Sequence, residues 1–218
     1  MAAAVEEYTS YYQAVYAAAT RTTGTTLVID SSKHSSLAYC LTTRDDIDLR
    51  VLQVVRDPRA VAYSWTKSVR RPEASPDGDE WMTGYRPAHT ALLWDSQNLA
   101  LNVLRRSAAD VRLLKYEDFV ASPRETITGI AQWVGLETSG SSPVSTDGTI
   151  TLTETHTVSG NPMRFQTGSI PIVRHEEWRT ELAPLQRRVV SALTLPLMAQ
   201  FGYSPFARES SPQPRKRR

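Results

Sequence analysis

Cysteine is scarce in this chain of 218 residues, and the single thiol, Cys40, excludes an internal disulfide or a cysteine-ligated metal cluster. No stretch approaches the roughly 18 consecutive apolar residues that a membrane-spanning helix requires. The first seven residues contain two glutamates and no lysine or arginine, which excludes the basic start of a secretory signal. From these absences we expect a protein of a reducing, cytoplasmic compartment without a membrane partner.

An excess of one charge is also missing, because 25 lysines and arginines face 23 acidic residues and the net charge is +2. Residues 208–218 hold five of the basic residues and one acid, so the rest of the chain is close to neutral. This distribution argues against a nucleic-acid partner, which would select a basic surface. The four histidines are scattered and lie in no acidic cluster, so we expect no metal.

The hydrophobic pattern predicts an α/β protein. Three short runs rich in Val, Ile and Leu read as strands, at 25–30, 50–55 and 110–115. Helical periodicity or helix-start signals predict helices at 5–20, 59–69, 87–106, 122–133 and 185–200. We expect Asp57 to cap the second of these, a capping box at Ser122 to open the fourth, and Pro196 to kink or shorten the last. Strands that alternate with helices favour a parallel sheet with flanking helices.

Length and composition predict one domain over residues 1–203. Apolar residues make up 40% of the chain, which is enough for a packed core. The segments 71–86 and 137–149 read as long loops, which are usually functional when they occur in compact domains. We expect residues 204–218, rich in Pro, Ser and Arg, to form a disordered basic tail.

Ligands of open parallel sheets bind beyond the carboxyl ends of the strands, so the residues after each predicted strand are the first candidates. Lys33 follows the first strand, and Arg56 follows the second, with Ser64 further along the next helix. A guanidinium and a hydroxyl beside a helix N-terminus suit a phosphate group, and a lysine can reach an anion as a point charge. Residues 116–118 follow the third strand, and we interpret this acidic segment as structural.

Each of these residues also has an ordinary structural interpretation. Arg56 would pair with a carboxylate, Ser64 would lie on the surface of its helix, and Lys33 would be a solvated loop lysine. His34 fits a bystander better than an acid or base. Taken one at a time, these residues do not decide between the two interpretations.

The ordered series of motifs is more specific than any single one. It comprises Asp-Ser-Ser-Lys at 30–33, Val-Arg-Asp-Pro-Arg at 55–59 with Ser64, Leu-Lys-Tyr-Glu-Asp-Phe at 114–119, Trp-Val-Gly-Leu at 133–136, and His-Thr-Val-Ser-Gly-Asn-Pro-Met-Arg-Phe at 156–165 followed by Trp178-Arg179. From about residue 10 to 203 this series resembles the sulfotransferase family, and its C-terminal part is similar to bacterial members. That family transfers a sulfonate group from 3'-phosphoadenosine 5'-phosphosulfate.

The resemblance implies a P-loop NTPase-like α/β fold and assigns roles to residues of this chain. Arg56 and Ser64 match the pair that binds the 3'-phosphate of the donor. Lys33 matches a lysine near the transferred group and is the expected catalytic residue. Asn161 and Arg164 fall in the stretch that closes over the donor nucleotide. The loop 71–86 would lie over the acceptor, which we expect to be a small molecule or a glycan with a hydroxyl or amine.

One element of the family pattern is not found. Family members begin with a strand, a Gly-rich phosphate loop and a helix, whereas the similar string at 21–26 follows a helix and precedes a predicted strand. We therefore expect an N-terminally incomplete fold, and the alternative function is an inactive remnant that binds the nucleotide. Asp30 and His34 are weak candidates for a general base, and none is assigned. Apolar surface left uncovered would favour a homo-oligomer. A nucleotide kinase-like protein is disfavoured, because no Gly-x4-Gly-Lys loop is present.

Overall fold

The computed structural model describes residues 2–71, 80–107, 110–137, 142–154 and 162–206. The chain divides into two compact units. The first comprises Met1–Val54 and Ser96–Leu114, and the second comprises Val55–Asp95 and Lys115–Arg218. None of the described helices is both long and apolar enough to cross a membrane.

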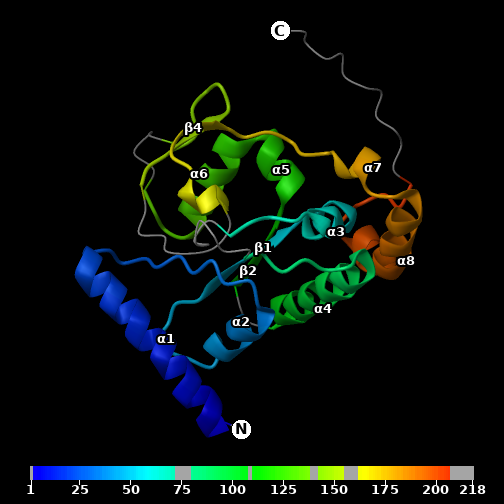
Figure 1. The fold of residues 1–218 in the computed structure, drawn as a ribbon. Coiled ribbons are helices and arrows are strands. Elements are labelled where there is room, and N and C mark those ends of the chain that lie inside the picture. Colours follow the sequence, from blue (N-terminus) through cyan, green and yellow to red (C-terminus); the bar gives the residue numbers. More distant parts are fainter. Residues whose placement is uncertain (1, 72–79, 108–109, 138–141, 155–161, 207–218) are drawn as a thin grey trace. The chain divides into compact units, whose positions relative to one another are not determined.

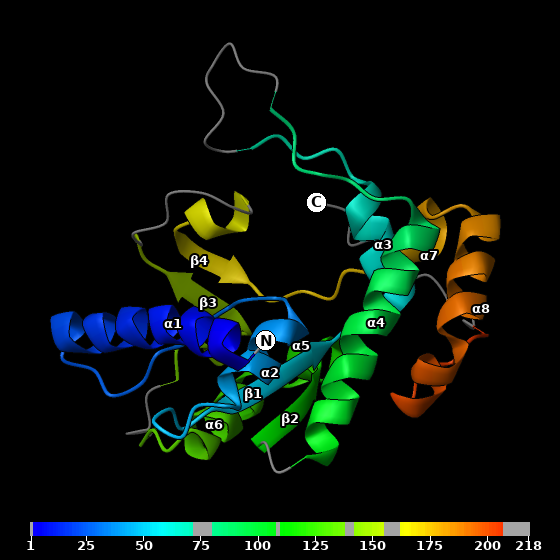
Figure 2. The ribbon, with the colours of Figure 1, turned by 90° about the horizontal axis from the view of Figure 1, so that it is seen from below.

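The first unit contains a small parallel sheet and two helices that contact each other. Helix α1 (Ala2–Thr23) packs on α2 (Ser35–Leu41). Most of β1 (Arg50–Val55) lies beside most of β2 (Asp110–Lys115), as Figure 2 shows, and the second half of α4 (Pro87–Arg106) completes the unit. The amide of Gln53 donates to Asn98 Oδ1 at 3.0 Å, so a buried hydrogen bond joins β1 to α4.

The second unit is built around three helices that pack together. Helix α3 (Pro58–Thr66) contacts both α7 (Trp178–Glu181) and α8 (Pro184–Gln200), and Figure 1 shows the three side by side. The unit also contains α5 (Tyr116–Ala121), α6 (Pro123–Trp133), the 3₁₀ helix η1 (Pro162–Phe165) and an antiparallel pair, β3 (Thr149–Leu152) and β4 (Gly168–Pro171). Its core contains Val55, Trp94, Met198, Phe201 and Tyr203, with a second cluster of Ala62, Ala91 and Val190.

Two of the three predicted strands are confirmed and one is wrong. Strands β1 and β2 have the predicted bounds, whereas residues 25–30 form no strand. Ile29 in that segment is 84% exposed, and no sheet of the described residues contains it. A β-branched run becomes a strand only where a neighbour takes up its backbone hydrogen bonds and covers a face. As a result, Lys33 does not follow a strand.

The predicted helices are present, but two details of their ends are wrong. The side chain of Ser122 makes no capping hydrogen bond. Ser122 also ends α5, with its N–H bonded to Asp118 O, and its backbone has φ −142° and ψ 66°. This ψ value lies outside the extended region that N-cap residues ordinarily adopt, which accounts for the missing hydrogen bond. Helix α8 continues through Pro196 to Gln200, so this proline does not shorten the helix, and the kink that we expect there remains a prediction.

A glycine turn after α8 returns the chain to the core. The N–H of Gly202 donates to Ala199 O, and the N–H of Tyr203 donates to Met198 O, which is the pattern of a Schellman motif. Gly202 has φ +75°, a backbone conformation that is sterically unfavourable for residues with a Cβ. The turn places Tyr203 in the same core cluster as Met198.

We expect Gly202→Ala to destabilise the protein by roughly 1–2 kcal/mol, because alanine is strained in the left-handed region. Urea unfolding followed by tryptophan fluorescence measures this change. Gly129→Ala is the matched control, because Gly129 lies inside α6 and an added Cβ would meet nothing within 4 Å. The Gly129→Ala variant should be more stable than the wild type by about 0.5–1 kcal/mol, because alanine favours the helix more than glycine does. Equal effects of the two substitutions would contradict the role of the turn.

Candidate functional site

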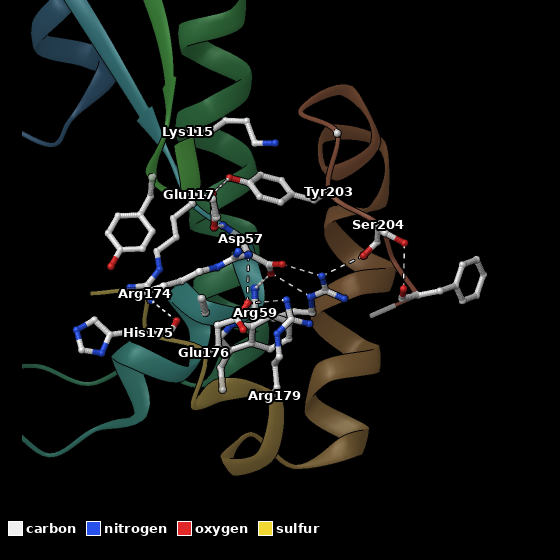
Figure 3. Close-up of a pocket in the computed structure, with 16 residues that line it drawn as sticks. Asp57, Arg59, Lys115, Glu117, Arg174, His175, Glu176, Arg179, Tyr203 and Ser204 are labelled. Carbon is white, nitrogen blue, oxygen red and sulfur yellow. Dashed lines mark hydrogen bonds and ion pairs between the residues drawn. The ribbon is translucent and has the colours of Figure 1, made fainter. Parts of the chain in front are cut away.

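A pocket of about 620 Å³ lies in the second unit, where β1 and β2 end. Arg56 directly follows β1 and Tyr116 directly follows β2. Figure 3 shows the side chains that line the pocket, and they come from the strand ends, α3, α7 with the segment before it, and the turn after α8 with the residues that follow it. The lining residues are Arg56, Asp57, Arg59, Ala60, Lys115, Tyr116, Glu117, Arg174, His175, Glu176, Trp178, Arg179, Gly202, Tyr203, Ser204 and Phe206.

The lining of the pocket is positively charged on balance. Five arginine or lysine side chains face three carboxylates, those of Asp57, Glu117 and Glu176. Glu176 accepts ion pairs from two of the cations, Arg174 at 3.1 Å and Arg179 at 3.0 Å. Within the part of the chain that the structure describes, Arg56 and Lys115 form no ion pair, so the pocket can accept an anion without breaking one.

The guanidinium of Arg56 is held by two weak contacts. It stacks over the ring of Tyr116, with 4.4 Å between its central carbon and the ring centroid. One of its NH₂ groups donates to the backbone oxygen of His175 at 3.1 Å. An arginine carries five N–H donors, and the described residues accept one of Arg56's. The remaining donors can bind a phosphate or sulfate group, to which the planar fork is matched.

Lys115 supplies a second cation from the end of β2. Its Nζ lies 4.8 Å from the ring centroid of Tyr203. An ammonium over an aromatic face is attracted by the negative face of the ring. Figure 3 shows the side chain of Lys115 extending toward Tyr203 at one end of the pocket.

The side chains of Asp57 and Arg59 together form the buried floor of the pocket. The Asp57 carboxylate accepts the backbone N–H of Arg59 at 2.9 Å, which confirms it as the N-cap of α3. It also accepts both Nε and an NH₂ group of Arg59, at 2.9 and 2.7 Å. The side chains are only 9% and 5% exposed. Arg59 further donates to the backbone oxygens of Ser204 and Pro205, so it fixes the segment after α8.

Among the predicted site residues that the structure describes, Arg56 alone lines the pocket. Arg56 lines the pocket, but Ser64, exposed in the last turn of α3, does not. Arg164 lies exposed in η1 and is not among the lining residues, and Asn161 lies outside the described residues. Lys33 is exposed in the segment between α1 and α2, in the first unit.

The weak candidates for a general base have different surroundings. Asp30 accepts the hydroxyl of Tyr16 at 2.6 Å and both the N–H and the hydroxyl of Ser32. Burial raises the pKa of Asp30, but these hydrogen bonds outweigh it and lower the pKa below its usual value. A carboxylate stabilised in this way is a weaker base. His34 is exposed at the start of α2, and its side chain makes no capping hydrogen bond.

Several pocket residues were missed by sequence reasoning. Tyr116 and Glu117 were interpreted as structural, yet both line the pocket. The rule of looking beyond each strand could have identified Tyr116 and Lys115, since β2 ends there. Arg174 and His175 carry no such signal, because they follow β4 in a segment without periodicity. Ser204, assigned to the tail, also lines the pocket.

Comparison with known proteins identifies one family. The family model described as a sulfotransferase domain matches residues 9–202. The matched region includes every pocket residue except Tyr203, Ser204 and Phe206. Comparisons with the curated proteins and with the solved structures found no match.

Proposed function

The chain belongs to the sulfotransferase family, and from this we propose that it transfers a sulfonate group from 3'-phosphoadenosine 5'-phosphosulfate to an acceptor hydroxyl or amine. The acceptor oxygen or nitrogen attacks sulfur, the bond from sulfur to the 5'-phosphate oxygen breaks, and the acceptor loses its proton. Adenosine 3',5'-bisphosphate is the leaving product. Small molecules and glycans both offer acceptors of this chemistry.

The observation that carries the proposal is Arg56 in its pocket. It has no ion pair among the described residues, it retains unused N–H donors, and it lies at a strand end beside the N-terminus of α3. A guanidinium favours a phosphate group, to which its planar fork is matched. The aromatic ring of Tyr116, under the guanidinium, adds an apolar face to the same wall.

The roles of the individual residues are those that the resemblance to the family implies. We assign the 3'-phosphate to Arg56 and Ser64, and the closure over the donor to Asn161 and Arg164. Binding energy from the 3'-phosphate, remote from the reacting sulfur, orients the donor for in-line transfer. Lys33 is the proposed cation that stabilises the charge developing during transfer.

Binding and turnover are measured separately to test the proposal. Calorimetry should show adenosine 3',5'-bisphosphate binding in the micromolar range. Incubation with the donor and a panel of phenols, amines and oligosaccharides should give a sulfonated product by mass spectrometry. Binding without any product across the panel would favour a nucleotide-binding protein without turnover. No heat at millimolar bisphosphate would reject the shared nucleotide site.

A further inference from the structure

The backbone around Arg56 is held by side chains from distant parts of the chain. The oxygen of Arg56 accepts the indole N–H of Trp94 at 3.1 Å. The N–H of Asp57, in the peptide group that follows Arg56, donates to Glu117 Oε1 at 3.2 Å. The oxygen of Val55, one residue before Arg56, lies 3.3 Å from the hydroxyl of Tyr203. The side chains of Trp94 and Glu117 therefore satisfy both polar groups of the Arg56–Asp57 peptide group, which the end of β1 would leave unpaired.

Glu117 and Tyr203 form one unit within this arrangement. The hydroxyl of Tyr203 donates to Glu117 Oε2 at 2.7 Å, while the other carboxylate oxygen accepts from Asp57, and Figure 3 shows the link between the two side chains. Tyr203 is 8% exposed. Burial raises the pKa of Tyr203 well above its usual value, and the hydrogen bond to Glu117 raises it further. The phenol thus stays protonated and remains a donor over the ordinary pH range.

The position of Tyr203 is set independently of the pocket. The Schellman turn at Gly202 and packing against Met198 fix its ring in the core. A carboxylate held on one side by a rigid phenol has little freedom to leave the Asp57 N–H on the other side. The Arg56–Asp57 peptide group is therefore connected to the core at its oxygen through Trp94, and at its N–H through Glu117 and Tyr203.

We propose that Glu117 and Tyr203 are positioning residues that together fix the Arg56–Asp57 peptide group and so hold the Arg56 guanidinium in the orientation that binds an anion. The identity of that anion, the 3'-phosphate of the donor, rests on the proposed function. Both residues line the same pocket, but their polar groups bond to Asp57 and to each other, so we assign them no direct contact with the anion. Their effect on affinity passes through Arg56, which distinguishes them from residues that only stabilise the fold.

Two variants test this role, each with a small structural change. Tyr203→Phe removes only the hydroxyl and keeps the ring in the core. Glu117→Gln keeps an acceptor for Asp57 but places a donor group opposite the phenol. The matched control is Tyr39→Phe, which removes a hydroxyl bonded to the backbone oxygen of Ala100 at 2.7 Å in the first unit. A thermal unfolding transition for each variant checks that it is folded.

The first readout is amide hydrogen exchange at Asp57 in the protein without ligand. Both variants should accelerate exchange at this amide about tenfold, while Tyr39→Phe leaves it unchanged. The second readout is the dissociation constant of adenosine 3',5'-bisphosphate. Tyr203→Phe should raise it about tenfold in the wild-type background and less than about twofold in the Arg56→Ala background.

The outcomes separate this inference from the function on which it rests. Unchanged exchange at Asp57 in both variants, or an equal loss of affinity in the Arg56→Ala background, overturns the positioning role. A wild-type protein that binds no bisphosphate overturns the proposed function. In that case the exchange measurement, which needs no ligand, still decides whether Glu117 and Tyr203 fix Arg56.

Discussion

Arg56→Ala should weaken the binding of adenosine 3',5'-bisphosphate about 100-fold. Each charge-assisted hydrogen bond to a phosphate is worth about 1.5–3 kcal/mol, and the guanidinium fork can make two. Two such bonds at the lower end of that range correspond to about two orders of magnitude in the dissociation constant. Calorimetry measures the change. The salt concentration is kept fixed, because ions screen the contacts between the protein and the phosphate.

The controls for Arg56→Ala separate charge from geometry and from general damage. Arg56→Lys keeps the charge but loses the fork, so we expect an intermediate affinity. Arg44→Ala removes a partly buried arginine that pairs with Asp46 outside the pocket, and the affinity of this variant should equal that of the wild type. If Arg44→Ala and Arg56→Ala weaken bisphosphate binding equally, Arg56 does not bind the phosphate directly.

Asp57→Ala should have the largest effect on stability. It leaves Arg59 charged and 5% exposed without its partner, and breaking a buried ion pair on one side costs about 3–5 kcal/mol. The loss of the N-cap of α3 adds about 1 kcal/mol. Since proteins of this size are stable by only about 5–15 kcal/mol, a combined loss of about 4–6 kcal/mol removes a large part of that stability. The urea midpoint, followed by circular dichroism, measures it.

Asp57→Asn and Asp46→Ala are the matched comparisons. Asparagine keeps an oxygen that can accept the N–H of Arg59, so the cap survives and the loss should be smaller than in Asp57→Ala. Asp46→Ala breaks an exposed ion pair with Arg44 and should leave the urea midpoint unchanged. A midpoint for Asp57→Ala equal to that of Asp46→Ala would show that the buried pair does not stabilise the fold.

The sequence predicted Arg56 because local signals there agree. A short apolar run ends at Val55, and Asp57-Pro58 is a strong helix start, so the strand end was visible. The failed strand at 25–30 has a similar composition, but a strand also needs a neighbour, and composition does not contain that information. The place of Lys33 after a strand is therefore wrong, whereas its catalytic role, which the family resemblance implies, remains a prediction.

The rest of the pocket depends on contacts between segments that are distant in the chain. Arg56 and His175 are 119 residues apart, and their hydrogen bond depends on how β4 leads into α7. Tyr203 meets Glu117 only because a glycine turn reverses the chain after α8. Periodicity and capping signals describe local structure, so they cannot reveal such contacts. Tyr116 is followed in the sequence by two acidic residues, which favoured a structural interpretation of the segment and drew no attention to the aromatic ring.

Ligand discrimination by the wild-type protein and Arg56→Ala tests the central claim most directly. Calorimetry compares adenosine 3',5'-bisphosphate with adenosine 5'-monophosphate, which lacks the 3'-phosphate. We predict that the wild type prefers the bisphosphate about 100-fold, and that Arg56→Ala reduces the preference to about threefold or less. An undiminished preference in the variant would mean that a different group holds the 3'-phosphate.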